Sequence, residues 1–439
     1  MKRILIAFVA LTALGGCGIF GGGDKKPKTP VLGERLPVLT YETGAEVDPS
    51  LADAQVDVPP AEANAAWPQT GGNAAHAIGH PALGQALGRA WTAKVAGSSK
   101  KARLAAGPVV GDGRVYVTDT EATVRAFNVS DGRLVWQTRL TDKGGNQAAL
   151  FGGGVSFNNG KVYATNGVGD AAALDAATGS VIWKVRPGGP LRGAPTVADG
   201  QIYVVSQDNQ IFALKQENGE TVWNEAATLE TSGVFGVAAP AAAQGTVVAG
   251  FSSGELTAFR YENGRAVWQD ALSRTSISTA VASLSDIDAA PVVDQGRVYA
   301  VGAGGRMVAM ELVTGQRHWE LNVAGISTPW VAGEWLFVVT DDARLMAIAR
   351  NSGKVRWITQ LPRWRDEEDK KGPISWSGPV LAGGRLLLVN NLGRLGNVAV
   401  ADGRLGTSVN VGAPVFLQPV VAQNTLFILD DEGRLSAWR

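Results

Sequence analysis

A repeated unit extends from residue 86 to the C-terminus and leaves few possible folds. The clearest copy, at residues 194–223, reads APTVADGQIYVVSQDNQIFALKQENGETVW, and tryptophans that end six copies lie 38 to 51 residues apart. A period of this length is typical of propellers and solenoids. Seven copies begin with a residue followed by proline, and an eighth, without the proline, begins near Gly154; the seven start at Gly107, Ala194, Ala239, Ala290, Thr328, Gly378 and Gln418.

Within each copy the segments have the pattern of strands and lack helical periodicity. Short runs of alternating apolar residues are separated by Asx-Gly or Thr-Gly pairs, which supply the positive φ angles of tight hairpins. Glycine is correspondingly frequent, with 56 of the 439 residues. Each copy therefore predicts one blade of four antiparallel strands, and the eight copies predict an all-β, eight-bladed β-propeller.

The two ends of the repeat region predict how the ring closes. The last copy stops at residues 435–439, LSAWR, which is its third strand, so a fourth strand is missing. Residues 88–91, GRAW, match the fourth strand seen at residues 264–268, GRAVW. We expect this N-terminal strand to complete the eighth blade and to remove the open sheet edges. The predicted propeller spans residues 86–439.

The N-terminal segment predicts export and membrane attachment. A basic start is followed by an apolar run at residues 4–14, too short to span a bilayer, so we interpret residues 1–16 as a signal peptide. Residues 14–17, LGGC, resemble the bacterial lipobox, which implies lipidation of Cys17 and anchoring to a membrane. Gly18 follows the cysteine where inner-membrane retention commonly uses Asp, so that resemblance implies the outer membrane.

Residues 17–85 are predicted to be the lipidated cysteine and a flexible Gly/Pro/Ala-rich tether. Within this tether, residues 67–73, WPQTGGN, are expected to dock onto the folded domain.

The chain has 40 basic and 40 acidic residues, which argues against nucleic-acid binding. One cysteine and three histidines cannot build a disulfide framework or a zinc site of Cys and His ligands.

Two family resemblances follow from these motifs. Residues 173–183, ALDAATGSVIW, resemble the tryptophan-docking repeat of quinoprotein dehydrogenases, which implies an eight-bladed fold and, in those enzymes, pyrroloquinoline quinone and calcium. The lipobox, the tether and eight bare repeats together resemble the BamB lipoprotein family of the outer-membrane β-barrel assembly machinery. The most specific motif for this second family is LSDID, at residues 284–288. This resemblance implies a scaffold without a cofactor.

The BamB resemblance also implies partner-binding residues. It assigns contact with the POTRA domains of BamA to Asp286 and Asp288. The family's second contact, a Leu-x-Leu-Arg-Gly stretch, aligns with residues 232–236 and includes Val234 and Phe235. Phe235 stands where the family has arginine, and a separate LRG-AP string occurs one blade earlier, at residues 191–195.

The lengths of the connections support the same surface independently. Crossovers from one blade to the next are longest before Pro291 and Pro379, at 23 and 22 residues from the preceding repeat tryptophan. Asp286 and Asp288 lie in the first of these, two residues apart, so in extended chain they point the same way as Leu284. Carboxylates beside an apolar residue suit a partner with Arg or Lys around a hydrophobic contact. Solvated acids or local caps, and a catalytic or metal-binding pair, are the alternatives.

The other long crossover, at residues 361–377, contains RWRDEEDKK and is either a second contact or a solvated loop. Exposed outer strands could also accept a strand from a client protein. Together with the lipobox, the BamB resemblance implies a non-enzymatic scaffold lipoprotein of outer-membrane protein assembly and insertion, at the periplasmic face of the outer membrane. It would bind BamA POTRA domains, other subunits of the machinery and unfolded clients. The alternatives are a pyrroloquinoline-quinone-dependent dehydrogenase and a ligand-binding periplasmic propeller.

Overall fold

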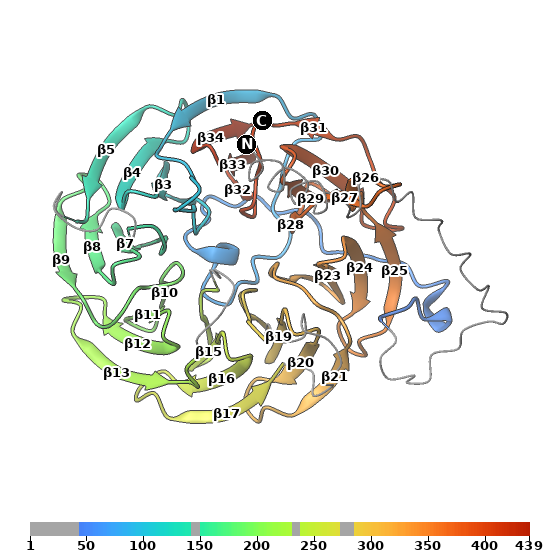
Figure 1. Ribbon diagram of the computed structural model, residues 1–439, viewed down its shortest axis with the longest axis horizontal. Coiled ribbons are helices and arrows are strands. Elements are labelled where there is room, and N and C mark those ends of the chain that lie inside the picture. Colours follow the sequence, from blue (N-terminus) through green and yellow to red (C-terminus); the bar gives the residue numbers. More distant parts are fainter. Residues whose placement is uncertain (1–43, 142–149, 231–237, 273–284) are drawn as a thin grey trace, which may run out of the picture. The chain divides into compact units, whose positions relative to one another are not determined.

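The computed structural model describes residues 44–141, 150–230, 238–272 and 285–439. Residues Gly44–Arg439 form one compact unit. Eight four-stranded antiparallel sheets are arranged as blades around a common centre (Figure 1). The predicted all-β, eight-bladed propeller is therefore confirmed.

In seven blades the strands follow each other in sequence from the innermost to the outermost, and in blade 8 the N-terminal strand is the outermost. Blade 1 contains β2 (Val109–Gly111), β3 (Arg114–Thr118), β4 (Thr123–Asn128) and β5 (Leu134–Arg139). Blade 2 contains β6 (Val155–Asn158), β7 (Lys161–Thr165), β8 (Ala171–Asp175) and β9 (Val181–Val185). Blade 3 contains β10 (Thr196–Ala198), β11 (Gln201–Val205), β12 (Gln210–Lys215) and β13 (Thr221–Ala226). Blade 4 contains β14 (Ala241–Ala243), β15 (Thr246–Gly250), β16 (Glu255–Arg260) and β17 (Ala266–Ala271).

The second half of the ring repeats this order. Blade 5 contains β18 (Val292–Asp294), β19 (Arg297–Val301), β20 (Met307–Glu311) and β21 (Arg317–Leu321). Blade 6 contains β22 (Trp330–Ala332), β23 (Trp335–Val339), β24 (Arg344–Ala349) and β25 (Val355–Gln360). Blade 7 contains β28 (Trp376–Ala382), β29 (Arg385–Asn390), β30 (Arg394–Ala399) and β31 (Val409–Asn410). Blade 8 contains β32 (Val420–Ala422), β33 (Thr425–Leu429), β34 (Arg434–Trp438) and, outermost, β1 (Arg89–Lys94).

Strand β1 closes the ring as the sequence predicts. It pairs antiparallel with β34, from Arg89 opposite Trp438 to Lys94 opposite Arg434. The backbones of Gly88 and Arg439 exchange two further hydrogen bonds of 2.7 and 2.9 Å. The first strand and the last therefore belong to one sheet, which removes an open edge.

Tryptophan and glycine join each blade to the next. The indole nitrogen of Trp136 donates to the carbonyl oxygen of Ala176 in blade 2 at 2.9 Å. A Cβ atom on Gly179 would lie 2.5 Å from the Trp136 ring, so only glycine fits beneath it. Among the described residues the same indole-to-carbonyl bond recurs at six other junctions, made by Trp91, Trp183, Trp223, Trp268, Trp319 and Trp357. The repeat thus encodes the contact between blades.

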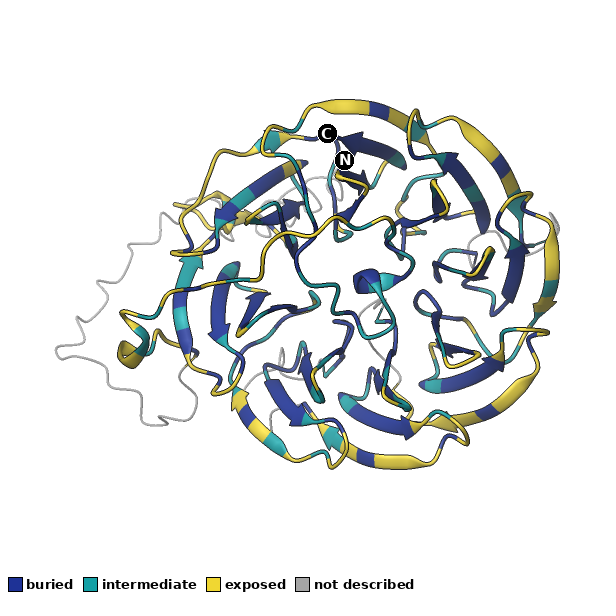
Figure 2. Ribbon diagram, turned by 180° about the vertical axis from the view of Figure 1, so that it is seen from behind, coloured by how far each residue is buried: buried dark blue, intermediate teal, exposed yellow. Residues whose placement is uncertain are grey.

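Burial follows the position of a strand in its blade. The inner three strands are almost entirely buried, whereas most residues of the outer strands are exposed or half-buried (Figure 2). In β13 only Trp223 is buried, and in β12 the four central residues all are. The core therefore consists of the packed interfaces between blades.

A segment that we call the belt, residues 62–81, passes around the middle of the ring before β1 begins (Figure 1). It forms a hydrogen bond with each of the eight blades, in the order 8, 1, 2, 3, 4, 5, 6, 7. In seven blades the partner is a backbone group in the innermost strand or directly after it. In blade 6 the partner is the side chain of Trp330. The contacts in blades 8, 1, 2 and 3 run from Asn64 to Gln423, Trp67 to Val110, Pro68 to Phe157 and Gln69 to Val197. Those in blades 4, 5, 6 and 7 run from Ala74 to Ala242, Ala75 to Val293, Gly79 to Trp330 and Pro81 to Gly383.

A second N-terminal stretch, residues 44–58, packs against blade 6, from the outer strand at Val47 to the inner β22–β23 turn at Asp57. Val47 forms a parallel bridge with Val355 of β25, and the Asp48 amide donates to the Val355 carbonyl at 2.8 Å. Lys354 also pairs with the Asp48 carboxylate at 3.2 Å.

The expected tether through residue 85 therefore differs from the structure, in which residues 44–85 pack against the propeller. The physical reason is that unpaired backbone groups of the strands need partners, and this segment supplies them. The docking expected for residues 67–73 is present, with the Trp67 side chain buried. Residues 17–43 lie outside the described part of the chain.

Candidate functional site

The acidic pair lies in the crossover from β17 to β18, on the face of the ring that carries all the blade-to-blade connections. Ile287, between the two acids, is buried, and its amide donates to the Phe251 carbonyl at 3.2 Å. Gly250 leaves the space that the Ile287 side chain fills. Because side chains alternate along extended chain, Asp286 and Asp288 project away from Ile287, as expected from their spacing.

Both carboxylates meet one arginine from another blade. Nη2 of Arg192 lies 3.1 Å from Oδ1 of Asp288 and 3.5 Å from Oδ1 of Asp286. Arg192 belongs to the crossover between β9 and β10, where its amide donates to the Val205 carbonyl at 2.9 Å. We call these three residues the acid–arginine cluster. It connects the crossover that leads into blade 3 with the crossover that leads into blade 5.

The cluster is buried, which the sequence does not predict. Asp286 is 0% exposed and Asp288 is 5% exposed, so the alternative of solvated acids is wrong. Burial raises the pKa of Asp288 to about 7; Arg192 opposes this rise, and the negative charges of Asp286 and Asp341 add to it.

The arrangement favours positioning of the crossovers over acid–base or metal chemistry. The Arg192 guanidinium lies within ion-pair distance of both carboxylates. Among the described residues, no group of three or more His, Cys, Asp or Glu side chains is placed to hold a metal ion. Charge-assisted hydrogen bonds of this kind fix loops to each other.

The structure does not describe the other predicted site residues. Cys17, Val234, Phe235 and Leu284 lie outside the described ranges. Arg192 was missed as a functional residue, although its signal is present: it is the arginine of the LRG-AP string at residues 191–195. Arg192 is part of the site because the fold brings it next to Asp286 and Asp288, although blades 3 and 4 separate them in the sequence.

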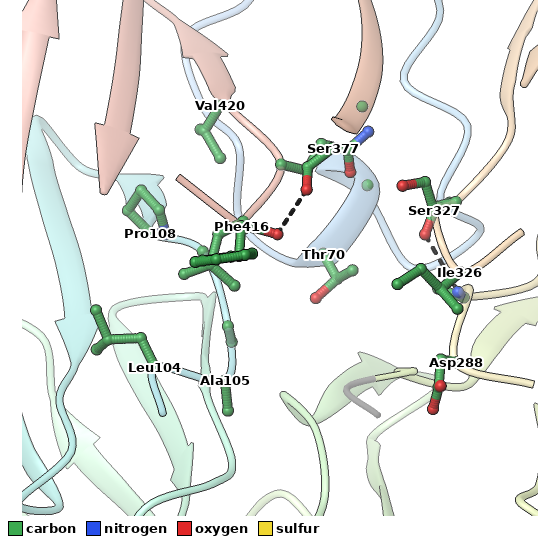
Figure 3. A pocket seen from close by; sticks show the side chains of 18 of the residues that line it. Thr70, Leu104, Ala105, Pro108, Asp288, Ile326, Ser327, Ser377, Phe416 and Val420 are labelled. Atoms are coloured by element: carbon green, nitrogen blue, oxygen red, sulfur yellow. Dashed lines mark hydrogen bonds between the residues drawn. The ribbon is translucent and has the colours of Figure 1, made fainter. Parts of the chain in front are cut away.

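A cavity of about 420 Å³ opens on the same face, beside the cluster. Crossover residues from several blades form its walls, and Trp67, Thr70 and Gly71 of the belt also line it. The two sides differ in composition. Figure 3 shows Leu104, Pro108, Phe416 and Val420 on one side, Ile326, Ser327 and Asp288 on the other, and Thr70 between them.

The second long crossover forms a hairpin of β26 (Trp364–Asp366) and β27 (Lys371–Pro373). Its acidic and basic residues are exposed, and the Arg363 guanidinium lies 5.3 Å from the centre of the Trp364 ring. The hairpin leads into β28, whose Trp376 lines the cavity. This crossover is therefore an ordered, charged projection beside the cavity.

The fold and its junctions define an eight-bladed propeller built from quinoprotein-type repeats. A family profile described as "Outer membrane protein assembly factor BamB" matches residues 82–148 and 143–359. The chain belongs to this family.

Curated relatives agree over nearly the whole length. The outer membrane protein assembly factor BamB of Escherichia coli K12 is 29% identical over 449 residues, covering 98% of this chain and 97% of the relative. The protein of the same name from Salmonella typhimurium LT2 is 29% identical over 450 residues, covering 99% and 98%.

Solved structures show the same fold at lower identity. The crystal structure of BamB from Moraxella catarrhalis has a TM-score of 0.68 and 19% identity, covering 81% of this chain and all of that one. A europium-containing methanol dehydrogenase has a TM-score of 0.66 and 15% identity, covering 85% and 89%. At these identities the likeness concerns architecture only. Among the described residues, no helix has the length and apolar composition needed to cross a membrane.

Proposed function

We propose that this protein is a non-enzymatic scaffold of outer-membrane β-barrel assembly that binds the POTRA domains of BamA. The observation that carries the proposal is membership of the BamB family, with relatives aligned over almost the whole chain. We further propose that a lipid on Cys17 anchors it to the periplasmic side of the outer membrane. Other subunits of the machinery and unfolded clients are additional expected partners.

The crossover face is the proposed docking surface. Since Asp286 and Asp288 are buried, they act mainly by holding the crossovers of blades 3 and 5 in place through Arg192. The family resemblance adds Val234 and Phe235 as further proposed contacts, and both lie outside the described residues. A partner that brings its own arginine or lysine would compete with Arg192 for the carboxylates.

The test measures binding of purified BamA POTRA domains from the same bacterium to the mature chain carrying Cys17→Ser. The double variant Asp286→Asn and Asp288→Asn keeps the side-chain shapes and removes the charges, and it should weaken binding at least tenfold. Asp119→Asn is the matched control, because Asp119 is also buried and paired with an arginine, Arg125, but in blade 1.

Circular dichroism must show that both variants remain folded. Equal binding by the double variant and the control would contradict the assigned role of the acids, and no binding by the unsubstituted chain would contradict the proposed function. The dehydrogenase alternative predicts a quinone absorption band after incubation with pyrroloquinoline quinone and calcium, followed by desalting. We expect no retained band.

A further inference from the structure

The apolar side of the cavity has exposed residues at its mouth. Phe416 is 45% exposed and Ile326, across the opening, is 49% exposed, whereas Leu104 and Val420 on the walls are buried. Single exposed apolar residues are ordinary on protein surfaces. Two that flank one cavity, whose walls include buried apolar residues, make this cavity a candidate binding site.

The opposite side of the cavity contains one carboxyl group, that of Asp288. Asp288 lines it, and among the described residues its Oδ2 atom has no hydrogen-bond partner, while Oδ1 is shared with Arg192. The other lining carboxylate, that of Asp431, already binds Arg103 at 2.8 Å. The Arg103 guanidinium also lies 5.7 Å from the Phe416 ring. The Arg103 guanidinium would repel a second cation near Phe416. A positively charged group that enters the cavity is therefore expected to lie toward Asp288.

We propose that this cavity binds an extended segment of a partner polypeptide that carries a large apolar side chain beside a lysine or arginine. The apolar side chain lies between Phe416, Leu104 and Ile326. The cationic group approaches Asp288 and the acid–arginine cluster. The cavity volume is within the range of ligand sites, and aromatic and arginine side chains in such pockets commonly dominate binding. This site goes beyond the proposed function, because it does not require the partner to be BamA.

The experiment uses a phage library of random linear heptapeptides, selected on the immobilised mature chain with Cys17→Ser. The selected peptides should carry Phe, Trp or Leu next to Lys or Arg. A synthetic peptide of the selected sequence is then titrated by calorimetry. Replacing its basic residue with glutamine should weaken binding about fivefold or more, and replacing it with glutamate should weaken binding further.

Two variants of the protein locate the binding site. Phe416→Ser should weaken peptide binding at least tenfold, and it should not impair folding because the side chain is partly exposed. Leu405→Ser is the matched control: Leu405 is 46% exposed and lies at the outer edge of blade 7, so binding should not change. The proposal is overturned if no peptide is enriched, if the enriched peptides are acidic, or if both variants bind equally. Because POTRA domains are absent, failure here is distinct from failure of the proposed function.

Discussion

Replacing Trp91 with alanine tests whether the junction made by the N-terminal strand contributes as much to the free energy of unfolding as a junction between two internal blades. Trp91 is buried, its indole nitrogen donates to the Val129 carbonyl at 2.9 Å, and its ring lies beneath Gly132. Loss of a buried tryptophan of this size typically lowers the free energy of unfolding by about 3–5 kcal/mol. The lost hydrogen bond adds little, because Nη2 of Arg439 also donates to that carbonyl, at 2.7 Å.

The assay is urea unfolding followed by circular dichroism, with Trp136→Ala as the reference. Trp136 makes the same contact between blades 1 and 2, so the two variants should lose the same free energy within about 1 kcal/mol. Trp364→Ala, in the exposed hairpin, should change stability by about 0.5 kcal/mol or less. If Trp136→Ala costs several kcal/mol and Trp91→Ala costs less than about 1 kcal/mol, the closure by β1 does not stabilise the ring.

Three further predictions concern the acid–arginine cluster, the junction glycines and the anchor. Because burial raises the pKa of Asp288 from 3.8 to about 7, the folded protein binds a proton that the unfolded chain releases. The free energy of unfolding should therefore fall as pH rises from about 4 to about 7. Asp288→Asn should reduce this fall by about 1–4 kcal/mol, as measured by unfolding between pH 4 and pH 8. Gly179→Ala should lower the free energy of unfolding by at least about 2 kcal/mol more than Gly160→Ala does. Both glycines have positive φ, but only Gly179 lies against Trp136. Thermal unfolding measures both losses, and equal losses would contradict this prediction. Cys17→Ser should move the protein from the membrane fraction to the soluble periplasmic fraction, and persistent membrane association would argue against the lipid anchor.

The blades could be predicted from sequence because their determinants are local. Alternating apolar residues, a turn with two positive φ angles such as Asp199–Gly200, and one tryptophan recur within each copy. The closure could be predicted for the same reason, since residues 88–91 carry the pattern of a fourth strand. The fold thus follows from short segments whose preferences agree with their neighbours.

Apart from the docking of residues 67–73, the belt could not be predicted, because its order comes from distant partners. Its Gly, Pro and Ala composition is typical of a flexible segment, and few of its residues can form a core of their own. Its stability depends on the blades, for example where the Ala74 carbonyl accepts from the Ala242 amide at 2.7 Å. Composition alone does not reveal such non-local hydrogen bonds.

The candidate site was predicted in part. Two-residue spacing placed Asp286 and Asp288 on the same side of the chain, and both contact Arg192. Their burial was not predictable, because Arg192 lies 96 positions from Asp288, with blades 3 and 4 between them in the sequence. The expected exposed acids are instead part of the framework that fixes the crossovers.

The N-terminal segment also limits where a client strand could be added. On blade 6, Val47 already pairs with the outer edge of β25, so this edge has a partner from the same chain. Within the described ranges, no other segment pairs with the outer edges of β5, β9, β13 and β17, whose exposed apolar side chains include Val135, Ile182, Val222 and Val267. A client strand added at one of these four edges would meet both a free backbone edge and exposed apolar side chains. Because these edges lie on the rim and the cavity lies on the crossover face, a client strand and a docked partner would not compete for the same surface.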